Sequence, residues 1–128
     1  MSSPPRTPQG AHRVVVCDYN ALLHSVTGLL RMSGYAVFQA YDGAAAAQLL
    51  QYMPEIDLLI LNTEGTGVDT PALVREVRQT RPGLLVLHIG THPLPGMAAD
   101  IPNLPETFTA EELLTTVGDL MERCPELG

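Results

Sequence analysis

Short apolar runs alternate with helix-like segments along the chain, and this alternation restricts the possible folds more than any other feature. The runs RVVVCD (13–18), YAVFQA (35–40), IDLLILN (56–62) and LLVLHI (84–89) are continuous and mostly aliphatic or aromatic. Such runs are typical of strands that are buried on both faces. A weaker run, IPNLP (101–105), predicts an edge strand, because its two prolines cannot donate hydrogen bonds to a neighbouring strand.

The segments between these runs carry signals for helices. Each begins with a polar residue that is suited to cap the first turn, and apolar residues follow at helical spacing. The predicted caps are Asn20, Asp42, Thr70 and, in a capping box with Glu112, Thr109. We expect the first helix to end near Gly34, the second at Pro54 and the third at Gly83.

The segment GTHPLPGMAAD, between the fourth and fifth strands, has a less regular pattern. Pro93 and Pro95 flank Leu94, so we expect only a short helix there, from Pro95 onward. Five strands in alternation with four or five helices predict an α/β fold. Its centre is a doubly wound, five-stranded parallel sheet covered by helices on both faces.

Composition limits the class of protein and the kind of partner. With 128 residues, 45% of them hydrophobic and 16% charged, the chain suits one globular domain. We expect this domain at 13–123, between a flexible Pro- and Ser-rich tail (1–12) and a short tail (124–128). The net charge is −7 and no lysine is present, which argues against direct nucleic-acid binding.

The sequence also suggests where the protein resides. Neither a secretory signal nor an apolar stretch long enough to span a membrane is recognisable. We therefore expect a cytoplasmic protein whose two cysteines, Cys17 and Cys124, remain thiols.

Three stretches of the sequence, YAVFQAYDGAAAAQLL, DLLILN followed by GVD, and FTAEELL, occur in a characteristic order and spacing. Together they resemble the receiver domain of bacterial two-component response regulators, with its flavodoxin-like (βα)5 fold. YAVFQAYDGAAAAQLL is similar to the family's second strand and helix, and DLLILN followed by GVD to its phosphorylation strand and turn. FTAEELL is similar to its last helix. The resemblance covers about residues 13 to 123.

The resemblance implies a phosphorylation pocket, but most of its functional residues are replaced. The family has an acidic pair that holds Mg²⁺, an Asp that accepts phosphate, a hydroxyl residue, and a Lys after the fifth strand. Carried over, these positions fall on Cys17 with Asp18, on Asn62, on Gly90 with Thr91 beside it, and on Glu106. A fifth-strand aromatic residue that often reorients on activation falls on Asn103.

The replacements remove the chemistry of phosphorylation. An amide is neutral and a poor nucleophile, so Asn62 is not expected to form an acyl phosphate. Asp18 is left nearly alone as a ligand for Mg²⁺, so we expect no metal and no other cofactor. Glu106 reverses the charge of the family's Lys and would repel phosphate.

Other interpretations of the pocket remain open. Asn62 is either an anchor that holds the pocket in one state or an amide that satisfies a neighbouring loop. Glu64 and Glu106 can turn toward Asp18 and Cys17 and form a weak metal site. Alternatively, Asp18 accepts backbone hydrogen bonds, and Cys17 is a buried hydrophobic residue.

The histidines nearest this pocket, His88 and His92, are interpreted as structural residues. Neither lies on an exposed helix of a bundle, where a histidine that carries a phosphoryl group would belong.

The sequence thus predicts a non-enzymatic pseudo-receiver in signal transduction that acts through protein–protein interaction without phosphorylation. Its partner would be another signalling protein or a second copy of itself, bound through the family's fourth-helix, fifth-strand and fifth-helix face. The residues expected at the centre of this surface are Pro93, Leu94, Pro95, Met97 and Asn103.

Two alternatives belong to other functional classes. A small-molecule sensor would use the vacated acidic pocket at the carboxyl ends of the strands. A flavodoxin-type enzyme is disfavoured, because the loop DYNALLH lacks the Gly, Ser and Thr residues that would bind a flavin phosphate.

Overall fold

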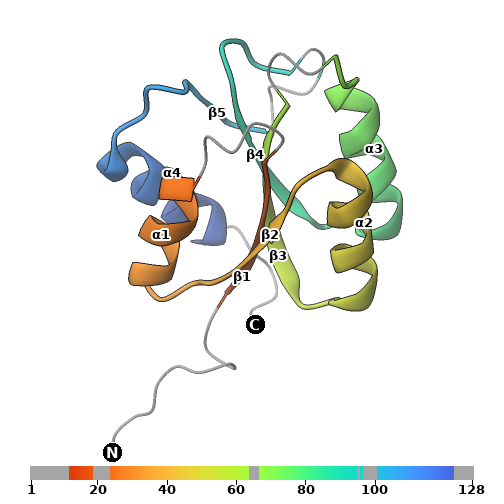
Figure 1. The fold of residues 1–128 in the computed structure, drawn as a ribbon, viewed down its shortest axis with the longest axis horizontal. Helices are drawn as coiled ribbons and strands as arrows, with labels where there is room; N and C mark the ends of the chain where they lie inside the picture. Colours follow the sequence, from red (N-terminus) through yellow and green to blue (C-terminus); the bar gives the residue numbers. More distant parts are fainter. Residues whose placement is uncertain (1–11, 19–23, 64–66, 95, 97–100, 123–128) are drawn as a thin grey trace, which may run out of the picture.

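The computed structural model describes residues 12–18, 24–63, 67–94, 96 and 101–122. These residues form one parallel sheet with helices on both of its faces (Figure 1). The strands are β1 (Arg13–Asp18), β2 (Ala36–Ala40), β3 (Ile56–Asn62), β4 (Leu85–Ile89) and β5 (Asn103–Leu104). The helices are α1 (His24–Met32), α2 (Gly43–Tyr52), α3 (Thr70–Thr80) and α4 (Ala110–Glu122).

The sheet has the strand order β2-β1-β3-β4-β5, and all its neighbouring strands are parallel. In Figure 1, α1 and α4 lie on one face of the sheet, and α2 and α3 lie on the other. This arrangement confirms the predicted doubly wound α/β fold. None of the helices in the described residues has the length and apolar character needed to cross a membrane.

The core consists of two layers, one on each face of the sheet. Alternate residues of β3 contribute to opposite layers: Leu58 and Ile60 lie with α1 and α4, and Leu59 and Leu61 lie with α2 and α3. All four side chains are fully buried. Burial on both faces explains why the central strands are continuously apolar in sequence.

The first helix ends as the sequence predicts. Gly34 has a positive φ of 98°, a conformation that glycine adopts without strain. The Tyr35 N–H then donates to the Leu30 carbonyl oxygen at 3.0 Å, which closes the last turn of α1. Tyr35 packs against the core layer of α1 and α4, and burial raises the pKa of its hydroxyl.

Two of the predicted helix caps are confirmed. Asp42 Oδ1 accepts a hydrogen bond from the Ala45 N–H at 2.8 Å at the start of α2. At the start of α4, Thr109 Oγ1 accepts from the Glu112 N–H at 3.0 Å, and Glu112 Oε1 accepts from the Thr109 N–H at 2.8 Å. These two reciprocal bonds form the predicted capping box.

The predicted cap of the third helix is wrong by one residue. Asp69 caps α3, because its Oδ1 accepts a hydrogen bond from the Ala72 N–H at 3.1 Å. Thr70 is already the first residue of the helix, and its buried hydroxyl bonds the Thr63 hydroxyl instead. The side chain of Thr70 therefore links α3 to the end of β3.

Prolines limit the last strand, and the structure describes only part of the connection that leads to it. β5 itself has only two residues, Asn103 and Leu104, since Pro102 and Pro105 on either side have no N–H to donate. No helix occurs among the described residues of the connection. The short helix expected from Pro95 onward falls mostly on residues that lie outside the described part.

Candidate functional site

The candidate site lies where β1 and β3 end side by side. Asp18 and Asn62, the last residues of these strands, are register partners in the parallel sheet. The carboxyl ends of parallel strands are the usual place for ligands in open α/β sheets. The fold therefore brings the predicted phosphoacceptor position next to the remaining acidic position of the predicted metal pair.

Asn62 has a defined polar partner. Its side chain is fully buried, and its Nδ2 donates a hydrogen bond to Glu106 Oε2 at 3.3 Å. Leu58 and Ile60 face α1 and α4, so strand alternation places Asn62 on this same face. Glu106 reaches it from the segment between β5 and α4.

In this contact, the donor and the acceptor are exchanged relative to those expected from the family's residues. An Asp and a Lys at these two positions would place the acceptor on β3 and the donor after β5. Asn62 is instead the donor, and Glu106 is the acceptor. The distance of 3.3 Å is long for an N–H to oxygen bond, so the contact is a modest one.

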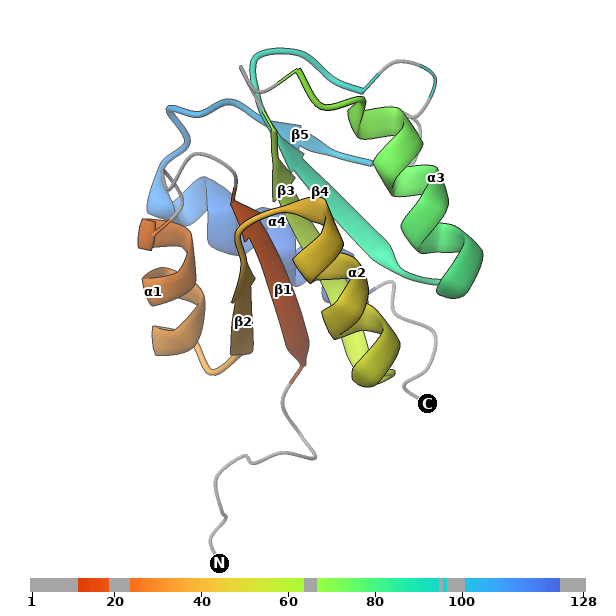
Figure 2. The ribbon, with the colours of Figure 1, turned by 45° about the vertical axis from the view of Figure 1, so that its right-hand side comes forward.

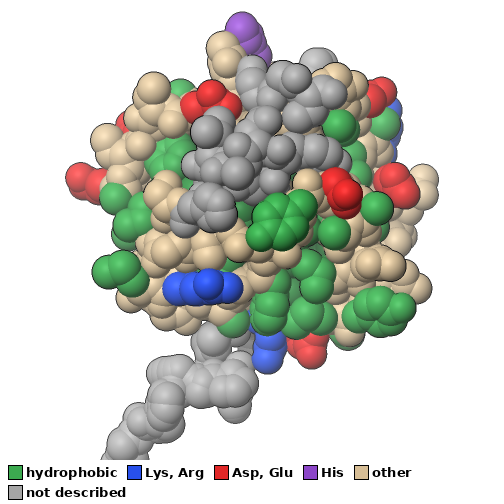
Figure 3. Space-filling model, viewed as in Figure 1, with side chains coloured by type: hydrophobic (Ala, Val, Ile, Leu, Met, Phe, Trp, Pro, Cys, Tyr) green, Lys and Arg blue, Asp and Glu red, His purple; other side chains and the backbone are tan. Residues whose placement is uncertain are grey.

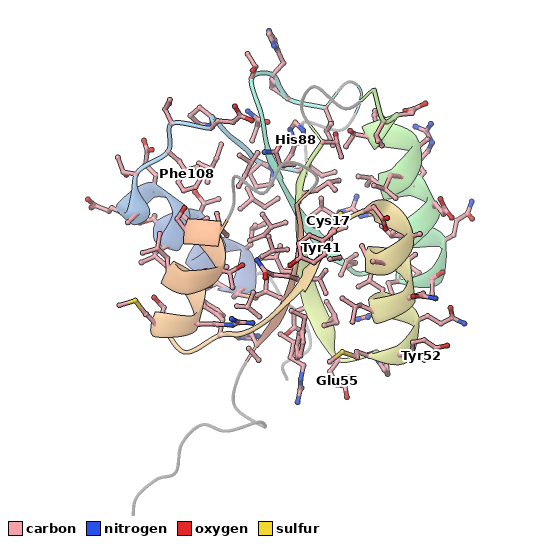
Figure 4. The ribbon with its side chains drawn as sticks, viewed as in Figure 1. Cys17, Tyr41, Tyr52, Glu55, His88 and Phe108 are labelled. Atoms are coloured by element: carbon pink, nitrogen blue, oxygen red, sulfur yellow. The ribbon has the colours of Figure 1, made fainter. Side chains whose placement is uncertain are left out.

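A second group of polar contacts joins β4 to β5. His88 and Asn103 are register partners, and His88 Nδ1 lies 2.5 Å from Asn103 Oδ1. Asn103 Nδ2 donates to the Gly90 carbonyl oxygen at 3.1 Å. His88 is buried and takes part in this network, as a structural histidine would (Figure 4).

The structure corrects two of the predicted site residues. Cys17 is fully buried in the core layer of α2 and α3 (Figure 4). Of its two interpretations, this agrees with a buried hydrophobic residue and not with a side chain that lines the pocket. Leu94 is also buried in that layer, so it is not available as a contact residue on the predicted interaction surface. Both side chains fill the core because strand alternation and the irregular connection direct them inward.

The other predicted positions are distributed as follows. Gly90 is buried, and its N–H donates to the Leu104 carbonyl oxygen at 2.9 Å. Thr91 and Pro93 are exposed, and Asn103 is half-buried. Glu64, Pro95 and Met97 lie outside the described residues, as does the side chain of Asp18.

In the described part of the chain, no group of three or more His, Cys, Asp or Glu side chains is arranged to hold a metal ion. At the site, the amide nitrogen of Asn62 points to Glu106. The described contacts thus hold two segments together, and none of them provides a nucleophile.

One buried contact escaped the sequence analysis. The hydroxyls of Thr63 and Thr70 form a hydrogen bond directly after Asn62, so the end of β3 is tied to α3 as well as to Glu106. Two threonines seven residues apart across a Gly-rich turn are a weak signal. Their contact becomes evident only in the structure, where α3 begins at Thr70 beside the end of β3.

Comparison with known proteins gives one curated relative and many similar structures. No family model matches the chain. The sensor kinase CckA of Brucella abortus (strain 2308) is 26% identical over 117 residues. The match covers 86% of this chain but only 12% of the kinase, so the chain spans a small part of that relative's length.

Several of the similar solved structures are response regulators or their receiver domains. A CheY-like response regulator receiver domain protein from Methanospirillum hungatei JF-1 has a TM-score of 0.79 at 15% identity, over 92% of this chain and 99% of that one. Chemotaxis protein CheY4 of Vibrio cholerae has a TM-score of 0.75 at 24% identity, over 86% and 98% of the two chains. A probable two-component system response regulator/GGDEF domain protein has a TM-score of 0.75 at 24% identity, over 92% of this chain and 52% of that one. The chain therefore has the fold of a response regulator receiver domain.

Proposed function

We propose that this chain is a pseudo-receiver, a non-enzymatic signalling module that is not phosphorylated at the usual position. It acts by binding another signalling protein or a second copy of itself. The proposal combines the receiver fold with the replacement of its phosphorylation residues by Asn62, Gly90 and Glu106.

The single observation that carries the proposal is the hydrogen bond from Asn62 to Glu106. An amide in place of the carboxylate cannot form an acyl phosphate. Glu106 in place of the cation adds negative charge where a transferred phosphoryl group would need positive charge. Because these two changes are matched as donor and acceptor, the link between β3 and the segment before α4 is retained without phosphate.

The contact surface belongs to the same proposal. We place it on the β4–β5 connection and the neighbouring face of β5 and α4, with Pro93, Pro95, Met97 and Asn103 as candidate residues. Leu94 is removed from this set because its side chain is buried. Homodimer formation through this face is one form that the interaction can take.

The small-molecule sensor receives less support. A ligand that accepts a hydrogen bond from the buried Asn62 amide nitrogen would have to displace Glu106, to which this nitrogen already donates. Binding to this nitrogen would therefore cost the free energy of the hydrogen bond that it already makes.

Incubation with acetyl phosphate tests the proposal directly. The wild-type chain is expected to give no phosphorylated species that is removed by hydroxylamine, as resolved on a phosphate-affinity gel. The control is the double variant Asn62→Asp with Glu106→Lys, which restores the acceptor and the cation. A hydroxylamine-sensitive band in the wild type would overturn the proposal.

NMR spectroscopy can distinguish loss of the phosphate-accepting carboxylate alone from loss of the whole phosphorylation site. Amide shifts are recorded for the wild type and for Asn62→Asp on addition of Mg²⁺ with beryllofluoride. We expect no response in the wild type. A response in the variant alone would mean that the exchange at Asn62 is the main barrier, whereas a wild-type response would contradict the proposed pseudo-receiver.

A further inference from the structure

The edge of the sheet at β2 carries exposed apolar side chains. β2 is the outermost strand on this side, and β1 is its neighbour among the described strands. In Figure 2, β2 lies at the margin of the sheet between α1 and α2. Tyr41, directly after β2, is 65% exposed, and Tyr52, the last residue of α2, is 75% exposed. Large side chains of this kind are seldom left so exposed without a reason in contact with a partner.

The outer flank of α2 extends this apolar area. The cavity between α2 and α3 identifies the flank of α2 that faces α3, because its lining on α2 consists of Ala47, Leu50 and Gln51. At about 100° per residue, Ala45, Leu49 and Tyr52 point away from that flank, to the side of β2. Ala45 and Leu49 are partly buried against the core layer of α2 and α3, as is Phe38 of β2.

Together these side chains form one surface, which we call the β2 surface. It consists of Phe38, Tyr41, Ala45, Leu49, Tyr52 and Met53. Figure 3 shows this side of the molecule, where hydrophobic side chains gather over β2 and the neighbouring flank of α2. Figure 4 shows that Tyr41 and Tyr52 both lie on this side.

Charge is almost absent from the β2 surface. The stretch YAVFQAYDGAAAAQLLQYMP (35–54) contains Asp42 as its single charged residue, whereas 16% of the whole chain is charged. The Asp42 carboxylate caps α2, since its Oδ1 accepts a hydrogen bond from the Ala45 N–H at 2.8 Å. A chain with a net charge of −7 thus has a nearly neutral surface on this side.

The backbone at the open edge of β2 is partly capped. The Ala36 N–H donates toward β1, to the His12 carbonyl oxygen at 3.0 Å, so the next residue, Val37, directs its backbone groups to the open edge. There the Val37 carbonyl oxygen accepts a hydrogen bond from Arg31 Nη2 at 2.9 Å. Charged side chains at an edge strand oppose the addition of another strand. A partner on this side should therefore bind through side chains and not by extending the sheet.

We propose that a second copy of this chain docks on the β2 surface about a two-fold axis, so that the surface packs against itself. In a two-fold contact the same patch of both copies meets, so charges of one sign would be brought together wherever the patch is charged. Two copies that each carry a net charge of −7 can avoid this repulsion at the neutral β2 surface. A strongly basic or acidic partner would form few ion pairs there.

The two tyrosines supply much of the area that a weak dimer needs. A buried tyrosine covers about 150–250 Å², and a two-fold contact buries Tyr41 and Tyr52 of both copies. With Phe38, Leu49 and Met53 at the same contact, the buried area approaches the roughly 1,000 Å² at which specific interfaces begin. Interfaces of this size are weak, and we expect a dissociation constant of about 10–300 μM.

The β2 surface is distinct from the contact surface of the proposed function, so the inference goes beyond that function. β2 and β5 form opposite edges of the sheet. A partner on the β5 side and a second copy on the β2 side can therefore be bound at the same time.

The test measures self-association of the full chain. Sedimentation velocity from about 10 μM to about 1 mM, a range that brackets the expected dissociation constant, should show a reversible equilibrium between monomer and dimer. Amide NMR shifts recorded on dilution should change at Tyr41, Ala45 and Tyr52. Asn103 and Leu104, on the opposite edge, should not respond.

Two variants of equal charge form a matched pair. Tyr52→Glu and Met32→Glu each add one negative charge, and each replaces an exposed hydrophobic residue at the last position of a helix. Met32 ends α1, on the opposite face of the sheet from α2. Tyr52→Glu should weaken the dimer at least about tenfold, because like charges then meet in the contact, and Met32→Glu less than about threefold. Circular dichroism at a concentration where the chain is monomeric should show that both variants are folded.

A third variant distinguishes side-chain packing from strand pairing. Arg31→Ala uncovers the Val37 carbonyl oxygen and should change the dissociation constant by less than about threefold, as expected for a surface charge outside the contact. A dimer tighter by more than about tenfold would mean that the two β2 strands pair, and would overturn the proposed contact.

The inference would also be wrong if the chain stayed monomeric at about 1 mM, the dissociation constant of a very weak complex. Shifts confined to β5 and α4 would place the dimer on the other surface, and equal losses in the two glutamate variants would show a general charge effect. None of these results depends on Asn62 or Glu106. The acetyl phosphate assay therefore decides on the pseudo-receiver whether or not the β2 surface binds a second copy.

Discussion

At the scale of single residues, the contact between Asn62 and Glu106 determines what the site can do. Asn62 is fully buried, so its amide needs polar partners, and Glu106 supplies one of them across the end of the sheet. A carboxylate in place of the amide would lie beside Glu106 with the same sign of charge. Asn62 and Glu106 are therefore complementary as donor and acceptor. Replacing only one of them with the family's residue should destabilise the fold.

The variant Asn62→Asp is expected to lower the free energy of unfolding at neutral pH by about 1–3 kcal/mol, the cost of a buried polar group that loses its partner. Adding Glu106→Lys should recover more than half of this loss, because the two charges then attract. Urea denaturation of the wild type, both single variants and the double variant gives the coupling energy. If Asn62→Asp were as stable as the wild type, or if the second change rescued nothing, the contact would not have the role assigned to it.

At the scale of helices and strands, the start of helix α3 depends both on local sequence signals and on a tertiary contact. Asp69 and Thr70 are adjacent, both are good caps, and Pro71 fits either the first or the second position of the helix. The structure uses Asp69 as the cap and gives the Thr70 hydroxyl to Thr63. The choice depends on a contact with the end of β3, which no local pattern contains.

Replacing the cap tests this assignment. Asp69→Ala should reduce the free energy of unfolding by about 1 kcal/mol, because the Ala72 N–H loses its acceptor. Asp69→Asn should be nearly neutral, since an amide oxygen also accepts this bond. Thermal unfolding followed by circular dichroism measures both. Equal stability of the alanine and asparagine variants would mean that the side chain of Asp69 does not cap α3.

The difference between local signals and tertiary contacts also explains which elements could be predicted from the sequence. The central strands are recognisable because burial on both faces makes them continuously apolar, and the capping box at Thr109 and Glu112 is a purely local signal. The inward direction of Leu94 could not be predicted, since two prolines leave no periodicity around it. The positions of Asn62 and Glu106 in one site followed from the resemblance to receivers, and their residue types fix the direction of a hydrogen bond between them. That the two side chains form this bond is seen only in the structure.

At the scale of the whole molecule, the described residues form one sheet with an apolar layer on each of its faces. The central strands contribute to both layers, so loss of packing in one should weaken the other.

Neighbouring leucines of β3 test whether the two layers unfold together. Leu58 faces α1 and α4, Leu59 faces α2 and α3, and both are fully buried. Leu58→Ala and Leu59→Ala should each cost about 2–5 kcal/mol, the usual range for a leucine removed from a core. Met32→Ala, at a side chain that is 86% exposed, serves as the control and should change stability by less than about 0.5 kcal/mol.

Because both leucines belong to the central sheet, each variant should still unfold in one transition. Urea unfolding curves from far-ultraviolet circular dichroism and from tyrosine fluorescence should then coincide for both variants. If Leu59→Ala instead gave two separate transitions, the layer of α2 and α3 would unfold on its own. A single transition instead means that loss of packing in one layer destabilises the entire domain, including the contact between Asn62 and Glu106.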